Sequence, residues 1–134
     1  MTYTEVRVTA ESNKFHVSNV QMYEYLDQAR HDWYRYCILI GVEAVIVHIS
    51  ADFKKEIFNR DQLQIRTRLE RVGNTSFTLK QVVTNNRDEL VASAEVVMAT
   101  IDRQVRTKVT VPNELRLMIN QDTPLNLLIN NRDS

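Results

Sequence analysis

The sequence predicts a single α+β domain in which a long antiparallel sheet wraps around one helix. Three observations predict it: an alternating segment opens the chain, one long helical pattern follows, and strand patterns fill almost all of the remainder. A helix with one apolar stripe cannot cover both faces of a long sheet. We therefore expect the sheet to curve around the helix, and its other face or an edge strand to meet a partner chain in an oligomer.

The first strand and the helix follow from hydrophobic periodicity. Residues 2–10 alternate polar and apolar side chains, which is typical of a half-buried strand. Over residues 20–40 the apolar positions recur every three or four residues and predict a helix of about five turns. Ser18 with Gln21 resembles a capping box that starts this helix, and Gly41 ends it. The apolar stripe consists of Met22, Tyr25, Leu26, Ala29, Trp33, Tyr36, Cys37 and Ile40.

About five antiparallel strands joined by short turns are predicted after the helix. Pro112 ends the last of them, and the tail beyond it predicts a short helix with an appended strand, or a segment that docks on a partner. We interpret residues 1–134 as one domain, with a core of about 2–115 and a C-terminal extension of 116–134. The predicted strands are residues 42–53, 62–72, 76–84, 90–101 and 105–111.

Composition excludes several classes of function. Seventeen basic residues balance seventeen acidic ones, so no net charge indicates a nucleic acid or an anionic membrane as a partner. Two glycines are too few for a phosphate-cradling loop or a dinucleotide fingerprint. The apolar run at 41–49 is too short to span a bilayer, and residues 1–8 lack the apolar core of a signal peptide. We therefore expect a cytoplasmic protein without a membrane span.

The cysteine and the histidines do not predict a metal site. The single cysteine, Cys37, excludes an intramolecular disulfide and is expected to be a small buried hydrophobe. His31 falls on the polar face of the helix and is expected to be solvated. His48 lies within an apolar strand and is expected in the core, so we predict no metal ligand set.

The segment HVSNVQMYEYLDQARHDW at residues 16–33 resembles the hotdog-fold thioesterases that act on acyl-CoA or acyl carrier protein, the 4-hydroxybenzoyl-CoA thioesterase-like family. In that family an Asp at a strand end is followed four residues later by H-V-N-N and then by an aromatic-rich helix containing E-A-R. His16, Val17 and Asn19 fall into this register without a gap. The hairpin at residues 66–83 is also similar, and the likeness covers about residues 4–115. It implies a hotdog fold and a homodimer or a homotetramer.

The sequence departs from this family at its catalytic position. Ser12 stands where the family has its Asp, and Lys14 stands where plant-type acyl-carrier-protein thioesterases have an Asn. After Phe53, where relatives have a basic residue, a Pro and a Gly, the sequence reads K-K-E-I-F-N-R-D and retains the basic Lys54 and Lys55. The resemblance therefore implies a thioesterase with a non-standard catalytic site.

Thioester hydrolysis in this family, as the resemblance implies, needs a carboxylate that activates water or attacks the carbonyl. Ser12 cannot act as a base. Glu11 is the nearest substitute, although neighbouring strand residues point to opposite faces unless a bulge intervenes. Glu43 is a second candidate, because some hotdog enzymes take their carboxylate from another element across the subunit interface.

His16 and Asn19 are the predicted partners of the thioester carbonyl. They are expected to polarise or position it, with the amides of the helix N-terminus stabilising the oxyanion and Ser12 holding water. An alternative is left open: a histidine before a helix can simply satisfy backbone carbonyls, and Asn19 can be an ordinary cap.

Basic side chains are predicted to contact the phosphates of coenzyme A or phosphopantetheine, which are parts of the substrate rather than cofactors. The alternative is an ordinary solvated charged face. The serine that follows the turn glycine of the hairpin is also predicted to bind the substrate. The predicted substrate-binding residues are Lys54, Lys55, Arg60, Arg68 and Ser76.

These features predict a hydrolase of acyl-CoA or acyl-carrier-protein thioesters acting on fatty or related acyl groups. The alternative is a hotdog domain that has lost its carboxylate and binds an acyl thioester or a partner protein without hydrolysis. A dehydratase of the same fold is a third interpretation, which the H-V-x-N register fits less well.

Overall fold

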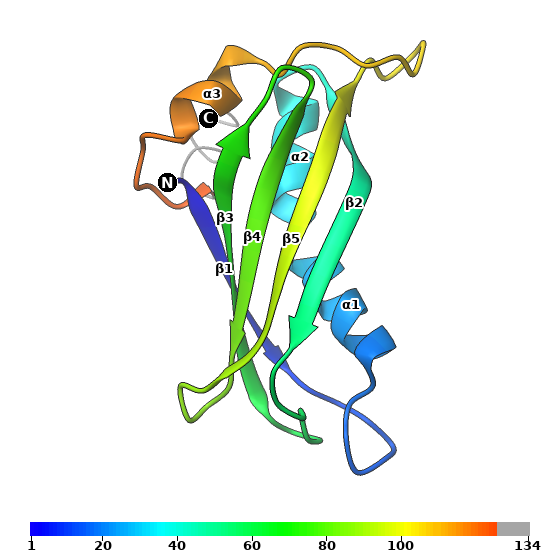
Figure 1. Ribbon diagram of the computed structural model, residues 1–134, viewed down its shortest axis with the longest axis vertical. Coiled ribbons are helices and arrows are strands. Elements are labelled where there is room, and N and C mark those ends of the chain that lie inside the picture. Colours follow the sequence, from blue (N-terminus) through cyan, green and yellow to red (C-terminus); the bar gives the residue numbers. More distant parts are fainter. Residues whose placement is uncertain (126–134) are drawn as a thin grey trace.

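The computed structural model describes residues 1–125, so the predictions for the final nine residues lie outside the described part of the chain. Figure 1 shows a long twisted sheet with two helices lying end to end along one of its faces. The elements are β1 (Tyr3–Thr9), α1 (Asn19–Ala29), α2 (His31–Leu39), β2 (Glu43–Phe53), β3 (Gln62–Val72), β4 (Ser76–Thr84), β5 (Leu90–Ile101) and α3 (Asn113–Met118).

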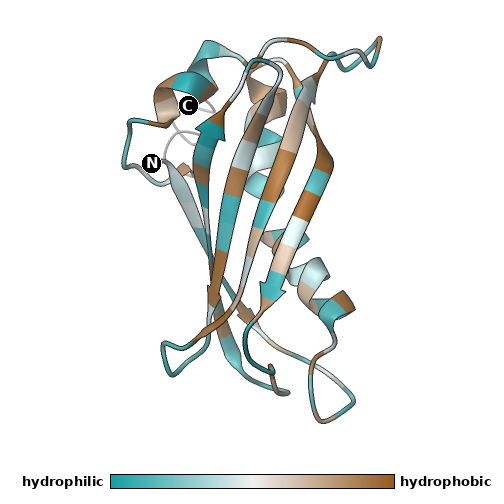
Figure 2. Ribbon diagram, in the orientation of Figure 1, coloured by the Kyte–Doolittle hydropathy of each residue, from teal (hydrophilic) through white to brown (hydrophobic). Residues whose placement is uncertain are grey.

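The sheet has the strand order β1-β3-β4-β5-β2, and every neighbouring pair is antiparallel. β1 and β2 are therefore its two edge strands. Inward residues of the central strands pack on the helices, and Figure 2 shows the corresponding alternation of apolar and polar positions along these strands. The predicted arrangement of an antiparallel sheet around a helical layer is confirmed.

The helix is divided at Arg30, which corrects the prediction of one continuous helix of about five turns. In a regular helix the Arg30 N–H would bond to the Leu26 carbonyl, but it donates to the Asp27 carbonyl at 3.0 Å. The Gln81 side chain from β4 donates to the Leu26 carbonyl instead, also at 3.0 Å. The buried Arg30 guanidinium in turn donates to Gln81 Oε1 at 2.8 Å. A side chain inserted into the helical hydrogen-bond ladder thus separates α1 from α2.

The strand predicted at residues 105–111 does not form, so four strands follow the helices. The segment contacts the sheet through an isolated bridge, Ile101 to Lys108, and through hydrogen bonds between Val109 and Thr100 of β5. Asp102 explains the difference, because its carboxylate accepts two following backbone N–H groups and turns the chain tightly. These bonds lower the pKa of Asp102. Arg106 then takes a positive φ of 62°, which breaks the extended conformation.

His48 is exposed rather than buried in the core as predicted. A β-bulge in β2 explains the error, because the register shifts between Ile46, opposite Met98, and His48, opposite Val97. The extra residue, Val47, reverses the alternation of side chains along the strand. His31 is exposed on the helix surface, as predicted.

The core has two clusters, one under α1 and one under α2. Cys37 lies in the second cluster, and burial raises the pKa of its thiol to about 12. Met118 of α3 and Leu125 also belong to this cluster, so the described part of the predicted C-terminal extension packs against the domain. The extension beyond residue 125 stays a prediction. No helix within residues 1–125 is long and apolar enough to cross a lipid bilayer.

Candidate functional site

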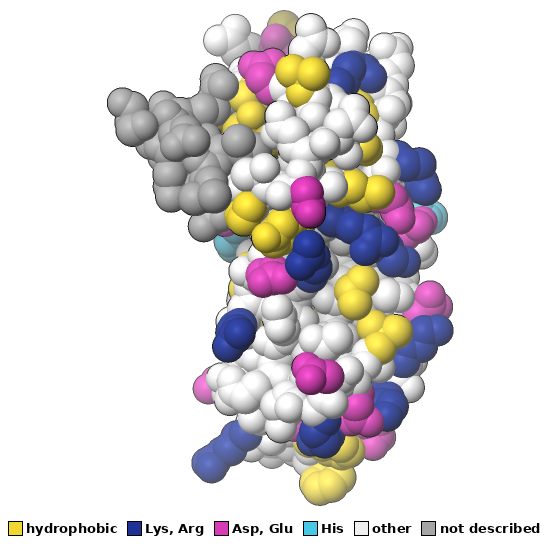
Figure 3. Space-filling view, turned by 90° about the vertical axis from the view of Figure 1, so that its left-hand side faces the viewer, with side chains coloured by type: hydrophobic (Ala, Val, Ile, Leu, Met, Phe, Trp, Pro, Cys, Tyr) yellow, Lys and Arg dark blue, Asp and Glu magenta, His cyan; other side chains and the backbone are white. Residues whose placement is uncertain are grey.

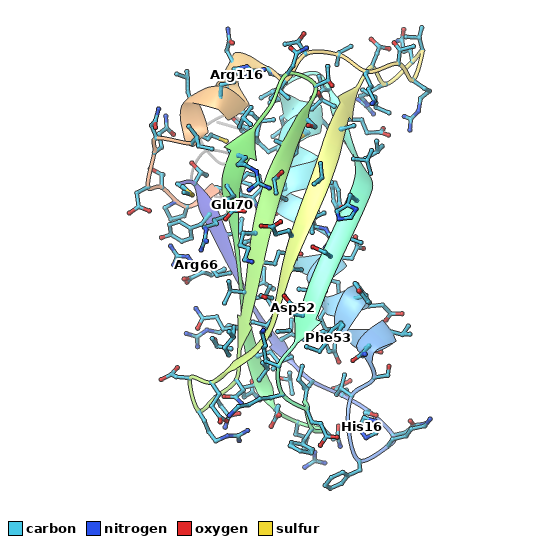
Figure 4. All side chains as sticks on the ribbon, viewed as in Figure 1. His16, Asp52, Phe53, Arg66, Glu70 and Arg116 are labelled. Atoms are coloured by element: carbon cyan, nitrogen blue, oxygen red, sulfur yellow. The ribbon has the colours of Figure 1, made fainter. Side chains whose placement is uncertain are left out.

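Two irregular segments meet at one end of the sheet and form the candidate site. One is the loop between β1 and α1, and the other is the segment that follows β2. The Val17 N–H donates to the Ile57 carbonyl at 2.7 Å, and His16 forms an antiparallel bridge with Phe58. Val17 and Ile57 are both buried, so this pairing anchors the loops to the core. In Figure 4 His16 lies beyond the end of β2 that carries Phe53.

Two cavities adjoin this pairing, and we call them the outer and the inner cavity. The outer cavity is about 980 Å³ and is lined by Glu11, Ser12, His16, Arg60 and others. The inner cavity is about 370 Å³. His16 and Ser18 line both cavities, so they mark where the two meet. The residues of the inner cavity are His16, Val17, Ser18, Asn19, Met22, Phe53, Lys54, Lys55, Glu56 and Ile57.

The structure brings together most of the predicted site residues, but not Arg68 or Ser76. Arg68 neighbours the buried Leu69 on β3 and therefore points to the opposite face of the sheet, where it lies 3.7 Å from Glu70. Ser76 begins β4 next to the β3–β4 turn, at the end of the sheet away from the two cavities. The residues found together are Glu11, Ser12, His16, Asn19, Lys54, Lys55 and Arg60.

The face that carries Arg68 is a mixed-charge surface. Figure 3 shows basic and acidic side chains intermingled on the side of the molecule that carries β1. Arg66 donates to Glu5 Oε1 at 2.8 Å and stacks over the Tyr3 ring at 3.9 Å. Here the alternative of a solvated charged face describes the geometry better than a phosphate site.

Ser12 anchors the loop in front of α1. Its hydroxyl donates to the His16 carbonyl at 3.1 Å and accepts from the Lys14 N–H at 3.0 Å. Its own N–H donates to Asn59 Oδ1 at 2.9 Å. The hydroxyl hydrogen is thus engaged with the backbone. In this geometry Ser12 positions His16, and the water-holding role stays a prediction.

Glu11 lies beside Ser12 in the outer cavity, contrary to the expected alternation. β1 ends at Thr9, so the strand geometry that would turn Glu11 away does not extend to it. Its backbone N–H donates a hydrogen bond to the Tyr25 hydroxyl at 3.0 Å. The predicted base therefore shares a cavity with His16.

Glu43 lies outside both cavities. It begins β2, whereas the inner cavity adjoins the end of that strand at Phe53. Its carboxylate pairs with Arg106 at 2.7 Å. Within one chain Glu43 is therefore far from His16, and the prediction that it acts across a subunit interface stays a prediction.

The N-terminus of α1 offers free amides next to the inner cavity. Ser18 is the cap, since its hydroxyl accepts from the Gln21 N–H at 3.1 Å. Asn19 is the first helical residue, so it is not the cap residue that the alternative interpretation required. Among residues 1–125 no acceptor is bonded to the N–H groups of Asn19 and Val20. These donors and the helix dipole favour negative charge at this position.

The walls of the inner cavity are part apolar and part charged. Met22 and Phe53 form an apolar side, and Phe53 packs edge-on against Tyr23 with 5.7 Å between ring centres. Lys54 adds a cation, for which the described residues supply no ion-pair partner. Lys55 is paired with Glu89.

The neighbours of Glu89 keep its carboxylate ionised. Hydrogen bonds from Lys55, Arg87 and Asn85 lower its pKa to about 2. The positive charge of Lys55 is thereby offset, so Lys54 is the cation of the inner cavity that is free to meet a phosphate.

Glu56 is a cavity residue that sequence reasoning missed. It lines the inner cavity together with His16 and Asn19. The segment K-K-E-I-F-N-R-D contains this acidic residue directly after the two lysines, but nothing local placed it next to the histidine. The pairing of Val17 with Ile57 brings it there.

Comparison with known families decides the classification. The model of the family described as the thioesterase-like superfamily matches residues 6–119. The chain belongs to this superfamily.

Individual relatives agree with this membership in the thioesterase-like superfamily. The long-chain acyl-CoA thioesterase FadM of Escherichia coli K12 is 26% identical over 113 residues, which cover 79% of this chain and 86% of that protein. A predicted thioesterase from Bacillus stearothermophilus has a TM-score of 0.78 at 17% identity, covering 88% of this chain and 94% of that one. The DHNA-CoA thioesterase of Staphylococcus aureus has a TM-score of 0.75 at 16% identity, covering 100% and 97%. The predicted hotdog fold is confirmed.

Proposed function

We propose that this thioesterase-like chain hydrolyses acyl-CoA thioesters where the outer and inner cavities meet. The single observation that carries the proposal is the position of His16. It lies between the two cavities and lines the inner one with Asn19, at an α1 N-terminus whose first two amides are free among the described residues. Membership in the superfamily and similarity to an acyl-CoA thioesterase support this reaction class.

The geometry supports a simple division of labour. The thioester carbonyl lies at His16 and Asn19, where an imidazole N–H and the helix amides stabilise the negative charge that develops on oxygen. The acyl group contacts Met22 and Phe53, and Lys54 attracts the phosphates of the carrier. The reaction needs no cofactor, because coenzyme A or phosphopantetheine is part of the substrate.

The finer details belong to this proposal. FadM is a long-chain acyl-CoA thioesterase, and the apolar wall of the inner cavity fits a fatty acyl group, so we propose fatty acyl-CoA as the substrate. Acyl carrier protein is the second carrier to test. We also propose a homodimer or a dimer of dimers in the cytoplasm.

A hydrolysis assay tests the proposal. The purified full chain is mixed with acyl-CoA of increasing chain length, and released thiol is measured with a chromogenic reagent. Cys37 is buried and its pKa is raised to about 12, so the protein itself adds little background. We expect saturable turnover, and His16→Gln should lower kcat/KM by roughly a hundredfold through loss of carbonyl stabilisation. His31→Gln, an exposed histidine outside both cavities, is the matched control. Absence of thiol release for every chain length and carrier contradicts the proposal.

Binding without hydrolysis is the second candidate function. It is favoured by the state of Ser12, which the expected register places at the family's carboxylate position and whose hydroxyl is engaged by the loop backbone. Calorimetric titration with acyl-CoA distinguishes the two functions. Saturable binding without thiol release supports the binder.

A further inference from the structure

Glu56 is the one carboxylate among the described residues that line the inner cavity. The same cavity contains His16 and Asn19, the two residues expected to hold a thioester carbonyl. Glu11, the base that the sequence predicts, lines the outer cavity, and Asn19 does not. A carbonyl held jointly by His16 and Asn19 therefore has Glu56 as its cavity neighbour.

Backbone pairing fixes the direction of Glu56. His16 bridges Phe58 in antiparallel fashion, and the Val17 N–H bonds to the Ile57 carbonyl. Continuing this register places Ser18 opposite Glu56. The middle pair, Val17 and Ile57, points into the core. Side chains alternate along extended segments, so His16, Ser18 and Glu56 point together to the cavity side.

The Glu56 carboxylate is also available to take up a proton. Among residues 1–125 it has neither a hydrogen bond nor an ion pair, and it is exposed. Glu43 is paired with Arg106, and Glu89 is held by Lys55 and Arg87. An unpaired carboxylate accepts a proton from water more readily than one that an ion pair keeps ionised.

The position opposite Ser18 gives Glu56 a suitable electrostatic setting. Ser18 caps α1, whose N-terminal end carries a partial positive charge. The helix end favours the oxyanion that forms when a water molecule next to Glu56 attacks the carbonyl.

We propose that Glu56 is the general base of the thioester hydrolysis, an inference that rests on the proposed function. Glu56 takes a proton from a water molecule while the water oxygen forms a bond to the carbonyl carbon. The carbonyl electron pair moves to oxygen, which His16 and the α1 amides stabilise. The tetrahedral intermediate then collapses with cleavage of the C–S bond, and Glu56 returns the proton to the leaving thiolate. The products are a fatty acid and the free thiol of coenzyme A.

Steady-state kinetics with a hydrolysed acyl-CoA test this assignment. Glu56→Gln keeps the shape of the side chain and removes the base, so we expect kcat to fall by roughly a hundredfold or more while KM changes less than threefold. Glu11→Gln is measured in parallel as the rival base, and Glu114→Gln should stay within about threefold of the wild type. Glu114 is exposed on α3 and serves as the matched control.

Chemical rescue separates a base from a structural residue. Glu56→Ala opens space in the cavity, and we expect added formate to restore part of its kcat, with no such effect on wild type or on Glu114→Ala. Thermal unfolding of each variant checks that it is folded.

The outcomes separate the base assignment from the function. If Glu56→Gln keeps more than half of the wild-type kcat, or if Glu11→Gln loses activity instead, Glu56 is not the base and the hydrolase function stands. If the wild type hydrolyses no acyl-CoA, the proposed function fails and the assignment fails with it.

Discussion

Single residues at the site divide into those with a local sequence signal and those without. The place of His16 and Asn19 in the loop before α1 was predictable because a polar, histidine-containing segment joins a strand pattern to a helix start, and their chemical roles stay predictions. The hydrogen bonds of Ser12 and the position of Glu56 were not, since they depend on a pairing between segments about forty residues apart. Sequence reasoning identified Ser12 as a substitution, whereas the structure gives it a positioning contact with His16.

Substitution of Ser12 tests both interpretations of this residue, as a replacement for the family's carboxylate and as a residue that positions His16. Ser12→Ala and Ser12→Asp both lose the bond that the hydroxyl donates to the His16 carbonyl, so they differ mainly in the added carboxylate. If the register with relatives is right, we expect kcat/KM of Ser12→Asp to exceed that of Ser12→Ala by about tenfold or more, because a carboxylate then faces His16 across the outer cavity. Thiol-release kinetics measure the ratio. Equal values would place the Ser12 side chain away from the reacting groups.

Elements were predicted well wherever the pattern was local. Three strands, β3, β4 and β5, have the predicted bounds, because alternation and turn residues lie within each segment. The errors arose from long-range contacts. Gln81 interrupts the helix at Arg30 from a different element, and the bulge at Val47 reverses the direction of His48. Periodicity in one segment cannot show a side chain inserted from another.

The turn between β4 and β5 should make stability depend on pH. Glu89 accepts hydrogen bonds from Asn85 and Arg87 and pairs with Lys55, and its pKa falls from the usual 4.5 to about 2. Because the folded pKa lies below the unfolded one, the stabilisation is complete above about pH 4.5 and is lost as the pH falls through about 2.

Glu89→Gln isolates this contribution. We expect the difference in urea midpoint between wild type and Glu89→Gln to be constant between pH 6 and 7 and to shrink as the pH falls from about 4.5 to about 2. Glu114→Gln, whose exposed carboxylate lies on α3, is the control. A midpoint difference that does not change over the acidic range would show that the ion pairs do not stabilise the fold in solution.

At the scale of the whole molecule, the sheet has an edge that no strand within residues 1–125 pairs with. β2 is an edge strand, and its outer residues include the exposed apolar side chains Ile46, Val47 and Phe53. An open strand edge with apolar side chains favours pairing with another strand. A partner chain, expected from the sequence on burial alone, stays a prediction, and β2 is the edge of the described sheet that offers it an apolar surface. Phe53 also lines the inner cavity, so a partner bound along β2 would lie next to the site.

A charge placed in the middle of β2 should therefore separate the subunits. Val47 is 55% exposed, so Val47→Lys disturbs the folded chain little, but it sets two lysines near each other in a symmetric antiparallel β2–β2 pairing centred on the strand. We expect the dimer dissociation constant to rise by roughly tenfold or more, measured by sedimentation at several protein concentrations. Leu117→Lys, at an equally exposed apolar position on α3, should leave the association unchanged. If both variants keep the wild-type mass, the subunits associate through a surface other than β2.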